Sequence, residues 1–324
     1  MKMAFAGFQH GHINGLQYMA ARCEDVVITG YYEENAETRK AMEKSLGVTF
    51  NYETYEDLLN DPEVEAVAIG DYFQKRGSMV IAALKKGKHV IADKPLCTDL
   101  EELAQIKQLS EEKNLQVGCM LDLRYMNQVE KVKDIIQSGE LGKVHVVAFT
   151  GQHCLNYGSR AGWYFEEGKH GGTINDLGIH GIDLVRMITG KNVTRVNHAM
   201  DWNAFADKEP GFKDCGQFSV MMEDMVVTGD VSYSAPKFSG TLPTYWSFHF
   251  WGTKGMLHFN MAESNIIRIY RETEEVIECD SQNAETLNDF IKATKGIPSM
   301  LDTASILESQ RQVLEIQKAA DAFH

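Results

Sequence analysis

The chain has 324 residues, a formal net charge of −14, 44% hydrophobic residues and 10% aromatic residues. Its length exceeds the size at which one hydrophobic core usually stops growing, so we predict two domains. The apolar content excludes a disordered chain, and the acidic balance argues against a nucleic-acid partner because it would repel a phosphate backbone.

The first part of the chain, from residue 2 to about 120, alternates short β-rich runs with helical stretches. Capping-box patterns at Thr54–Asp57 and Thr98–Glu101 predict the starts of two helices, and Gly87 predicts the end of another. This alternation predicts an α/β domain with a parallel, doubly wound sheet. The expected strands are residues 3–6, 26–29, 66–69, 89–92 and 116–119.

The rhythm changes after about residue 122. A helix over residues 127–137 should end at Gly139, and Trp246, Phe248 and Phe250 alternate with Ser247 and His249 at the period of a strand. We predict an α+β second domain with a large, mostly antiparallel sheet, and domains of residues 1–121 and 122–324. The expected strands are 144–150, 217–222, 225–233, 245–251 and 255–260, and helices at 283–295 and 305–322 should close the chain.

A glycine turn follows the first expected strand. Gly7 should end this strand and His12 should begin a helix, so that backbone N–H groups point at a pyrophosphate favoured by the helix dipole. The full G-x-G-x-x-G pattern is absent because Gln9 and His12 occupy its second and third glycine positions. An ordinary strand-to-helix turn explains the glycine about equally well.

Two glutamates follow the second expected strand, which ends near Tyr32. Glu33 and Glu34 lie at about the distance from Gly7 where dinucleotide folds place the acid that binds the ribose 2′-hydroxyl. A carboxylate there disfavours a 2′-phosphate, so we predict NAD rather than NADP. Alternatively, both glutamates only stabilise the start of a helix containing residues 36–44.

Lys94 stands before a proline at the carboxyl end of the expected strand 89–92. Ligands bind at this edge of such sheets, and Pro95 fixes the turn, so the lysine can be held in one direction. The alternative is a surface lysine with a solvated amine.

A second polar feature lies on the expected helix 174–188. Asp176, His180 and Asp183 form one polar stripe on a helix that is otherwise apolar, which is typical of the wall of a site. The alternative is an acid at the helix N-terminus with a hydrogen-bonded core histidine.

These motifs carry a family resemblance. The segments 87–95 and 171–183, together with residues 139–144 and Trp163, resemble the glucose-fructose oxidoreductase / inositol dehydrogenase / rhizopine-catabolism (Gfo/Idh/MocA) family over nearly the whole chain. The resemblance implies a Rossmann domain, a second domain whose open sheet often forms homo-oligomer contacts, and NAD(P)-dependent oxidation or reduction of sugars, polyols and related compounds.

The resemblance also implies roles for individual residues. Lys94 matches the catalytic lysine of the family's E-K-P motif, and Asp176 and His180 match its D-x-x-x-H motif. Arg124 matches a frequent basic position that contacts substrate or pairs locally. The expected cofactor residues are Gly7, Phe8, Gln9, His10, Gly11, His12, Ile13, Glu33, Asp71, Tyr72, Asp93, Lys94 and Pro95, and the expected substrate residues are Arg124, His153, Trp163, Asp176 and His180.

The sequence departs from the family pattern at two places beyond the glycine turn. Asp93 replaces the usual glutamate, and a shorter carboxylate should still interact near the nicotinamide ribose. Residues 70–73 replace a Thr-Pro-Asn-like loop, so Asp71 places an extra negative charge near the pyrophosphate.

Hydride transfer from an alcohol requires a base for the hydroxyl proton. An imidazole with an ordinary pKa near 6.5 suits this work at neutral pH. Our hypothesis is that His180 is the general base in oxidation and the acid in reduction, that Lys94 polarises the reacting oxygen, and that Asp176 orients substrate and His180.

The sequence also offers features of a metal site and of a protein that binds a dinucleotide without turning over a substrate. His10 and His12, with His153 and His170 available, suggest a metal site, but no cysteine or carboxylate stands at matching spacing, so we predict no metal. A catalytically silent dinucleotide sensor is the alternative to an enzyme.

The six cysteines form no C-x-x-C pair, and no segment approaches the roughly twenty apolar residues of a membrane span, so we expect a soluble cytoplasmic protein.

Overall fold

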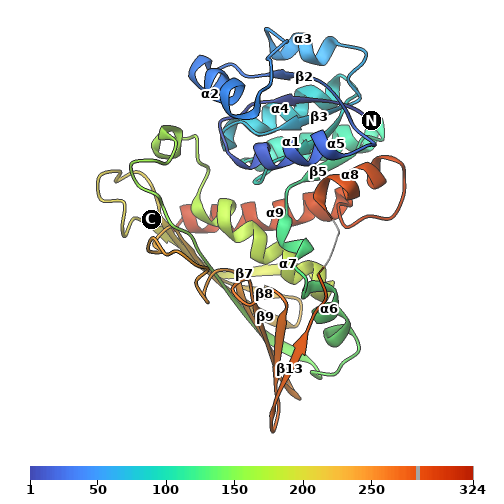
Figure 1. The fold of residues 1–324 in the computed structure, drawn as a ribbon. Coiled ribbons are helices and arrows are strands. Elements are labelled where there is room, and N and C mark those ends of the chain that lie inside the picture. Colours follow the sequence, from blue (N-terminus) through green and yellow to red (C-terminus); the bar gives the residue numbers. More distant parts are fainter. Residues whose placement is uncertain (282–284, 324) are drawn as a thin grey trace. The chain divides into compact units, whose positions relative to one another are not determined.

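The computed structural model describes residues 1–281 and 285–323 (Figure 1). These residues form two compact units. Unit 1 contains residues 1–120, 161–171 and 285–310, and unit 2 contains the other described residues. Unit 1 therefore recruits two segments from late in the sequence, and the predicted division between residues 121 and 122 stays a prediction.

Unit 1 is built on a five-stranded parallel sheet with the order β2-β1-β3-β4-β5. This confirms the predicted doubly wound sheet. The order reverses between β1 and β3, and ligands of such sheets bind outside the carboxyl ends of the strands at this point. The strands are β1 (Lys2–Ala6), β2 (Val27–Tyr32), β3 (Ala66–Ile69), β4 (His89–Ala92) and β5 (Val117–Cys119).

Helices surround this sheet in Figure 1. The predicted capping box of Thr54 and Asp57 is present at the start of α3, but the second capping prediction was wrong. Asp99 rather than Thr98 caps α5, because its carboxylate accepts the N–H groups of both Glu101 and Glu102. The helices are α1 (His12–Arg22), α2 (Ala36–Leu46), α3 (Tyr55–Asn60), α4 (Phe73–Lys85), α5 (Leu100–Lys113) and α8 (Thr286–Thr294), with a short 3₁₀ turn η2 (Gly162–Phe165).

Unit 2 is built on an eight-stranded sheet with the order β13-β12-β11-β10-β6-β9-β8-β7. Among the strand pairs of this sheet in the described residues, only β6–β9 is parallel, so the predicted mostly antiparallel sheet is confirmed. Strands β7, β12 and β13 were not predicted. The strands are β6 (Val144–Gln152), β7 (Val193–Trp202), β8 (Cys215–Met222), β9 (Met225–Ser232), β10 (Ser247–Gly252), β11 (Gly255–Asn260), β12 (Ile266–Tyr270) and β13 (Glu274–Glu278).

The helices of unit 2 include α6 (Val129–Gln137), α7 (Ile179–Thr189) and the 3₁₀ turn η1 (Asp122–Tyr125). The last helix, α9 (Thr303–Asp321), contributes residues to both units. Of the predicted helix 283–295, residues 283 and 284 lie outside the described part of the chain.

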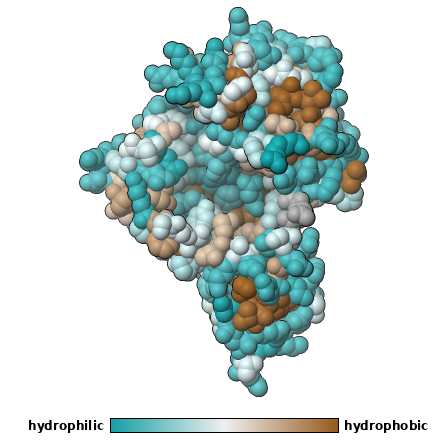
Figure 2. All heavy atoms as spheres, in the orientation of Figure 1, coloured by the Kyte–Doolittle hydropathy of each residue, from teal (hydrophilic) through white to brown (hydrophobic). Residues whose placement is uncertain are grey.

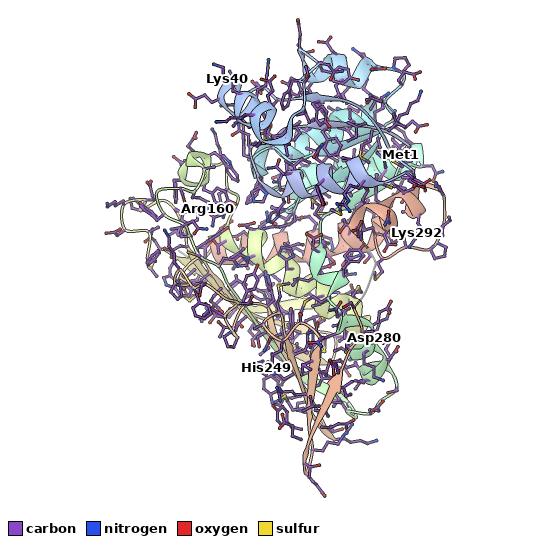
Figure 3. The ribbon with its side chains drawn as sticks, viewed as in Figure 1. Met1, Lys40, Arg160, His249, Asp280 and Lys292 are labelled. Atoms are coloured by element: carbon purple, nitrogen blue, oxygen red, sulfur yellow. The ribbon has the colours of Figure 1, made fainter. Side chains whose placement is uncertain are left out.

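The period-two pattern of β10 is observed. Phe248 and Phe250 are fully buried, whereas His249 faces the opposite side and stacks on His258 of β11, with ring centroids 4.4 Å apart. His249 is labelled in Figure 3. Gly181 of α7 explains how this helix approaches the sheet: a Cβ atom at that position would lie 2.0 Å from the Phe149 ring. One face of the sheet is therefore the core of unit 2.

Among the described residues, none of the helices is both long and apolar enough to cross a membrane. The face drawn in Figure 2 is mostly hydrophilic, with hydrophobic side chains in small separate patches. Exposed large hydrophobic residues such as Tyr18, Phe205 and Phe238 are scattered along the sequence.

Candidate functional site

The glycine turn of unit 1 leaves little room for a side chain. Gly7 has a φ of +76°, and a Cβ atom there would lie 2.7 Å from Cβ of Asp71. The N-cap of α1 is Gly11, which has no side chain to cap the first-turn amide groups. The turn therefore combines a close backbone approach with a helix N-terminus, and this combination suits an anionic phosphate group.

Glu33 is held inside unit 1 rather than presented at its surface. The side chain is fully buried, and its carboxylate accepts the N–H groups of Phe8 at 2.5 Å and Asn35 at 2.7 Å. Burial raises the pKa of Glu33, and the two N–H groups oppose that rise. Glu33 thus ties the glycine turn to the end of β2, and its role as a ribose ligand stays a prediction. Asn35, not a glutamate, caps α2.

Asp71 does not bring an unbalanced negative charge to the site. Its carboxylate accepts the N–H of Tyr72 at 2.8 Å and lies 2.9 Å from the Lys75 ammonium, which also pairs with Glu34 at 2.5 Å. Burial works to lower the pKa of Lys75, but the charges of Asp71 and Glu34 raise it above its ordinary value. The extra charge expected near the pyrophosphate is therefore paired with a lysine of α4.

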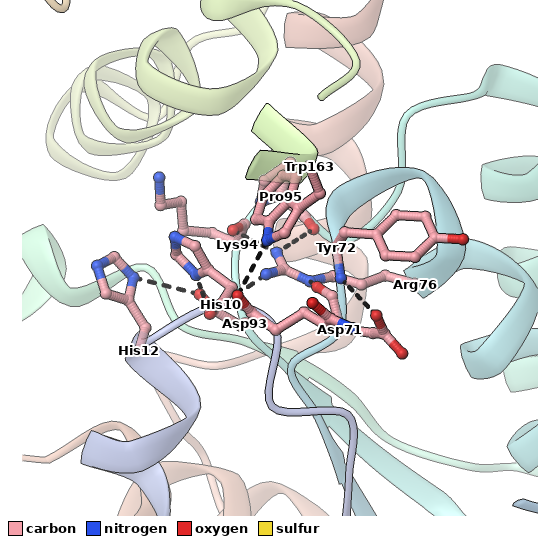
Figure 4. A network of polar contacts seen from close by, with 10 residues as sticks. His10, His12, Asp71, Tyr72, Arg76, Asp93, Lys94, Pro95 and Trp163 are labelled. Atoms are coloured by element: carbon pink, nitrogen blue, oxygen red, sulfur yellow. Dashed lines mark hydrogen bonds and ion pairs between the residues drawn. The ribbon is translucent and has the colours of Figure 1, made fainter. Parts of the chain in front are cut away.

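Arg76, which the sequence did not single out, organises the segment after β4 (Figure 4). This fully buried guanidinium donates to the carbonyl oxygens of Asp71, Lys94 and Pro95, and its Nη2 lies 3.3 Å from Oδ2 of Asp93. Because one rigid group bonds both sides of Lys94, the backbone of the Asp-Lys-Pro segment is fixed.

Lys94 itself is only 4% exposed, and its ammonium lies 5.8 Å from the centroid of the Phe73 ring. The alternative of a surface lysine with a solvated amine is therefore wrong. Lys94 is thus a buried side chain beyond the carboxyl end of β4, the edge at which such sheets bind their ligands, and its catalytic role stays a prediction.

The two histidines of the glycine turn meet Asp93. The His10 Nδ1 contacts Oδ2 of Asp93, and the His12 Nδ1 lies 3.3 Å from Oδ1. Burial lowers the pKa of His10 to about 4, despite the raising effect of Asp93. Trp163 covers this turn, since its indole Nε1 donates to the carbonyl of Gln9 at 3.0 Å. Asp93 is therefore the carboxylate that lies beside these two histidines, and spacing along the sequence did not reveal it.

In unit 2 the predicted helix 174–188 is divided. A π-helical turn, η3 (Ile174–Gly178), precedes α7, and such turns often occur at functional sites. Gln317 of α9 accepts the N–H groups of Ile174 and Asn175 at 3.0 and 3.1 Å, which fixes the turn that carries Asp176. Asp176 is 1% exposed and His180 is 8% exposed.

Trp246 joins two of the predicted site residues of unit 2. Its ring lies 5.0 Å from the His180 ring and 5.3 Å from the His153 ring. Gly151 permits this packing, because a Cβ atom there would lie 2.5 Å from the indole. The sequence pattern assigned Trp246 only to the sheet, and nothing in its local spacing indicated the two histidines.

Arg124 shows the local pairing that the sequence left open. Its guanidinium donates to both carboxylate oxygens of Asp183, at 2.8 and 2.5 Å, and both side chains are buried. Direct contact of Arg124 with a substrate stays a prediction.

Comparisons with known proteins agree with this architecture. Residues 1–120 match the model described as "Oxidoreductase family, NAD-binding Rossmann fold", and residues 129–258 match the "GFO/IDH/MocA C-terminal domain". The chain belongs to the Gfo/Idh/MocA family. In this Gfo/Idh/MocA protein, the predicted cofactor residues and Trp163 lie in unit 1, and Arg124, His153, Asp176 and His180 lie in unit 2.

Among its relatives is a myo-inositol 2-dehydrogenase of Thermotoga maritima, 26% identical over 192 residues, which are 58% of this chain and 54% of that protein. This Gfo/Idh/MocA chain thus spans about half the length of that relative. Similar solved structures include an aldose-aldose oxidoreductase from Caulobacter crescentus complexed with glycerol, with a TM-score of 0.81, 18% identity and coverage of 100% of this chain and 98% of that one. Another is a levoglucosan dehydrogenase in complex with NADH and levoglucosan, with a TM-score of 0.81, 16% identity and coverage of 100% and 97%.

Proposed function

We propose that the protein is an NAD(P)-dependent oxidoreductase that interconverts a CH–OH group and a carbonyl group on a sugar, a polyol or a related compound. The observation that carries the proposal is Lys94, a buried lysine at the carboxyl end of β4 whose backbone carbonyl, with that of Pro95, accepts a hydrogen bond from Arg76. The names of the relatives support the substrate class, since they include an inositol dehydrogenase and sugar-converting enzymes.

The residues of unit 1 fit a dinucleotide. Gly7 leaves a cradle that a Cβ atom would fill, and the uncapped start of α1 offers amide donors for phosphate oxygens. When bound, a nicotinamide dinucleotide supplies the acceptor or donor of the hydride. We favour NAD over NADP because Glu33 follows β2 at about the position where dinucleotide folds place the acid that binds the ribose 2′-hydroxyl.

The chain's own groups handle the proton and the charge. Lys94 polarises the oxygen of the reacting CH–OH or carbonyl group, and this stabilises the negative charge that develops there. In oxidation His180 accepts the hydroxyl proton while the hydride leaves the carbon, and in reduction it returns a proton to the oxygen. Asp176 orients the substrate and His180.

Lys94→Met tests the first role. We expect kcat to fall by about 10²–10⁴-fold, the usual worth of a positioned catalytic group, with NADH affinity changed little. Lys40→Met, at an exposed position of α2, is the control and should keep wild-type rates. Wild-type turnover by Lys94→Met would refute the assignment. His180→Asn should lose less activity.

The substrate class needs a screen. NADH and NADPH titrations followed by protein fluorescence establish which dinucleotide binds, and absorbance of the reduced nicotinamide during a screen of polyols and sugars reports turnover. Dinucleotide binding without turnover on any substrate would favour a catalytically silent sensor over an enzyme.

A further inference from the structure

A cluster of three possible metal ligands lies at the glycine turn of unit 1. Side-chain atoms of His10, His12 and Asp93 all lie within 4.8 Å of one another (Figure 4). His10 and Asp93 are buried, whereas the side chain of His12 is half-exposed at the start of α1. The three residues therefore converge from the turn and from the end of β4, with one side open to solvent.

The two carboxylate oxygens of Asp93 differ in the hydrogen bonds that they accept. Its Oδ2 is shared by His10 and Arg76, whereas its buried Oδ1 accepts no hydrogen bond from any residue that the structure describes. The His12 Nδ1 lies 3.3 Å from Oδ1. A buried carboxylate oxygen without a hydrogen bond is costly, and a cation between Oδ1 and His12 would remove that cost.

The donor set indicates which cation fits. Two imidazole nitrogens and one carboxylate suit Zn²⁺ and similar divalent transition metals, and three protein ligands leave a fourth position open. Metal–ligand bonds of about 2.0–2.2 Å in a tetrahedron place ligand atoms roughly 3.3–3.6 Å apart. The distance from His12 Nδ1 to Asp93 Oδ1 meets this spacing, and the shorter contact between His10 and Asp93 has to lengthen on binding.

Arg76 supplies the outer support that metal-ligating carboxylates usually have. Its Nη2 lies 3.3 Å from Oδ2 of Asp93, while its Nε and Nη1 donate to the backbone carbonyls of Asp71, Lys94 and Pro95. The orientation of the carboxylate is therefore set before any metal arrives. The positive charge of Arg76 lowers the expected affinity, which favours a reversible site over a permanent structural one.

We propose that His10, His12 and Asp93 form a reversible site for a divalent transition metal such as Zn²⁺. Metal binding fixes His12 and Asp93, and it places positive charge and a bound water or ligand on the solvent side of the turn. If the proposed function holds, Asp93 and this turn also receive the dinucleotide, so metal and dinucleotide compete, and each weakens the binding of the other by the same factor.

Cobalt(II) is the direct probe, because its absorption distinguishes nitrogen and oxygen ligands from thiolates and needs no enzymatic activity. The purified full chain, first treated with a chelator, should bind one equivalent with ligand-field bands and without a thiolate charge-transfer band. The lack of a thiolate band excludes cysteines as the cobalt ligands, which matters because Cys23, Cys154 and Cys279 are partly exposed. Zn²⁺ should displace the cobalt.

Variants assign the ligands. His12→Gln should weaken cobalt and zinc binding at least about tenfold, since even loss of an outer-sphere partner usually costs about 10–100-fold. His145→Gln removes an exposed histidine of unit 2 and should bind like wild type. Asp93→Asn is the second ligand variant, but it removes a buried partner of Arg76, so the half-exposed His12 carries the test if Asp93→Asn does not fold.

The outcomes are distinguishable. Unchanged metal affinity in His12→Gln, or a thiolate spectrum in the wild type, overturns the site. NADH titrations with and without Zn²⁺ then address competition: an apparent NADH affinity that falls with Zn²⁺ in the wild type but not in His12→Gln supports it, and a Zn²⁺-independent affinity overturns it. If NADH does not bind at all, the proposed function fails while the cobalt result still decides the metal site.

Discussion

Replacing Arg124 by methionine separates a structural role from a substrate-binding role. The guanidinium makes two charge-assisted hydrogen bonds to Asp183, at 2.8 and 2.5 Å, and the two side chains are 1% and 2% exposed. At about 1.5–3 kcal/mol for each such bond, their loss amounts to about 3–6 kcal/mol. This agrees with the roughly 3–5 kcal/mol measured when one partner of a buried ion pair is removed.

Urea unfolding followed by circular dichroism measures this loss. Arg195→Met is the matched control, because Arg195 is exposed and its side chain donates a hydrogen bond to Asn197. It should change the free energy of unfolding by less than about 0.5 kcal/mol. The double variant Arg124→Met/Asp183→Leu should recover much of the lost stability, because it removes the stranded charge. A wild-type free energy of unfolding in Arg124→Met, with only KM raised, would refute the structural reading and favour substrate contact.

Three further predictions concern backbone approach and acid stability. In Gly7→Ala, the alanine has to adopt the left-handed backbone of this position, and its Cβ atom clashes with Asp71. NADH affinity in a fluorescence titration should therefore fall at least about tenfold. Gly181→Ala pushes a methyl group into Phe149 and should lower the free energy of unfolding in urea by about 1–3 kcal/mol. Burial lowers the pKa of His258 from 6.5 to about 4, so the folded chain binds fewer protons than the unfolded chain between these values, and stability falls as the pH drops through this window. Thermal melts across it should show a shallower fall for His258→Gln.

The sheets were predictable because their signals are local. Strands β1, β3, β4 and β5 of unit 1 are short, mostly buried runs between helix signals, and β10 shows a period of two that one buried face imposes. Strand β13 was missed because four of its five residues are exposed and three are glutamates, so burial leaves no pattern in it. Strand β7 was missed for a similar reason, since exposed residues interrupt its alternation.

The site was predictable only in part. The positions of Lys94 and the glycine turn follow from strand ends, which local sequence marks. By contrast, Arg76 reaches its acceptors from the first turn of α4, and Trp246 contacts His153, which follows β6, and His180 of α7. Such partners are set by how elements pack, so no spacing along the chain reveals them.

Two departures from the family pattern turn out to be neighbours. His12 stands at the third glycine position, and Asp93 stands where the family has a glutamate, yet the structure places their side chains 3.3 Å apart. A glycine at position 12 would leave Oδ1 of Asp93 without that nearby imidazole, and a glutamate at position 93 would need room for another methylene where the side chain is already fully buried. The two departures therefore meet in a single contact. A metal ion bound by both side chains, as we propose, accounts for the two departures together.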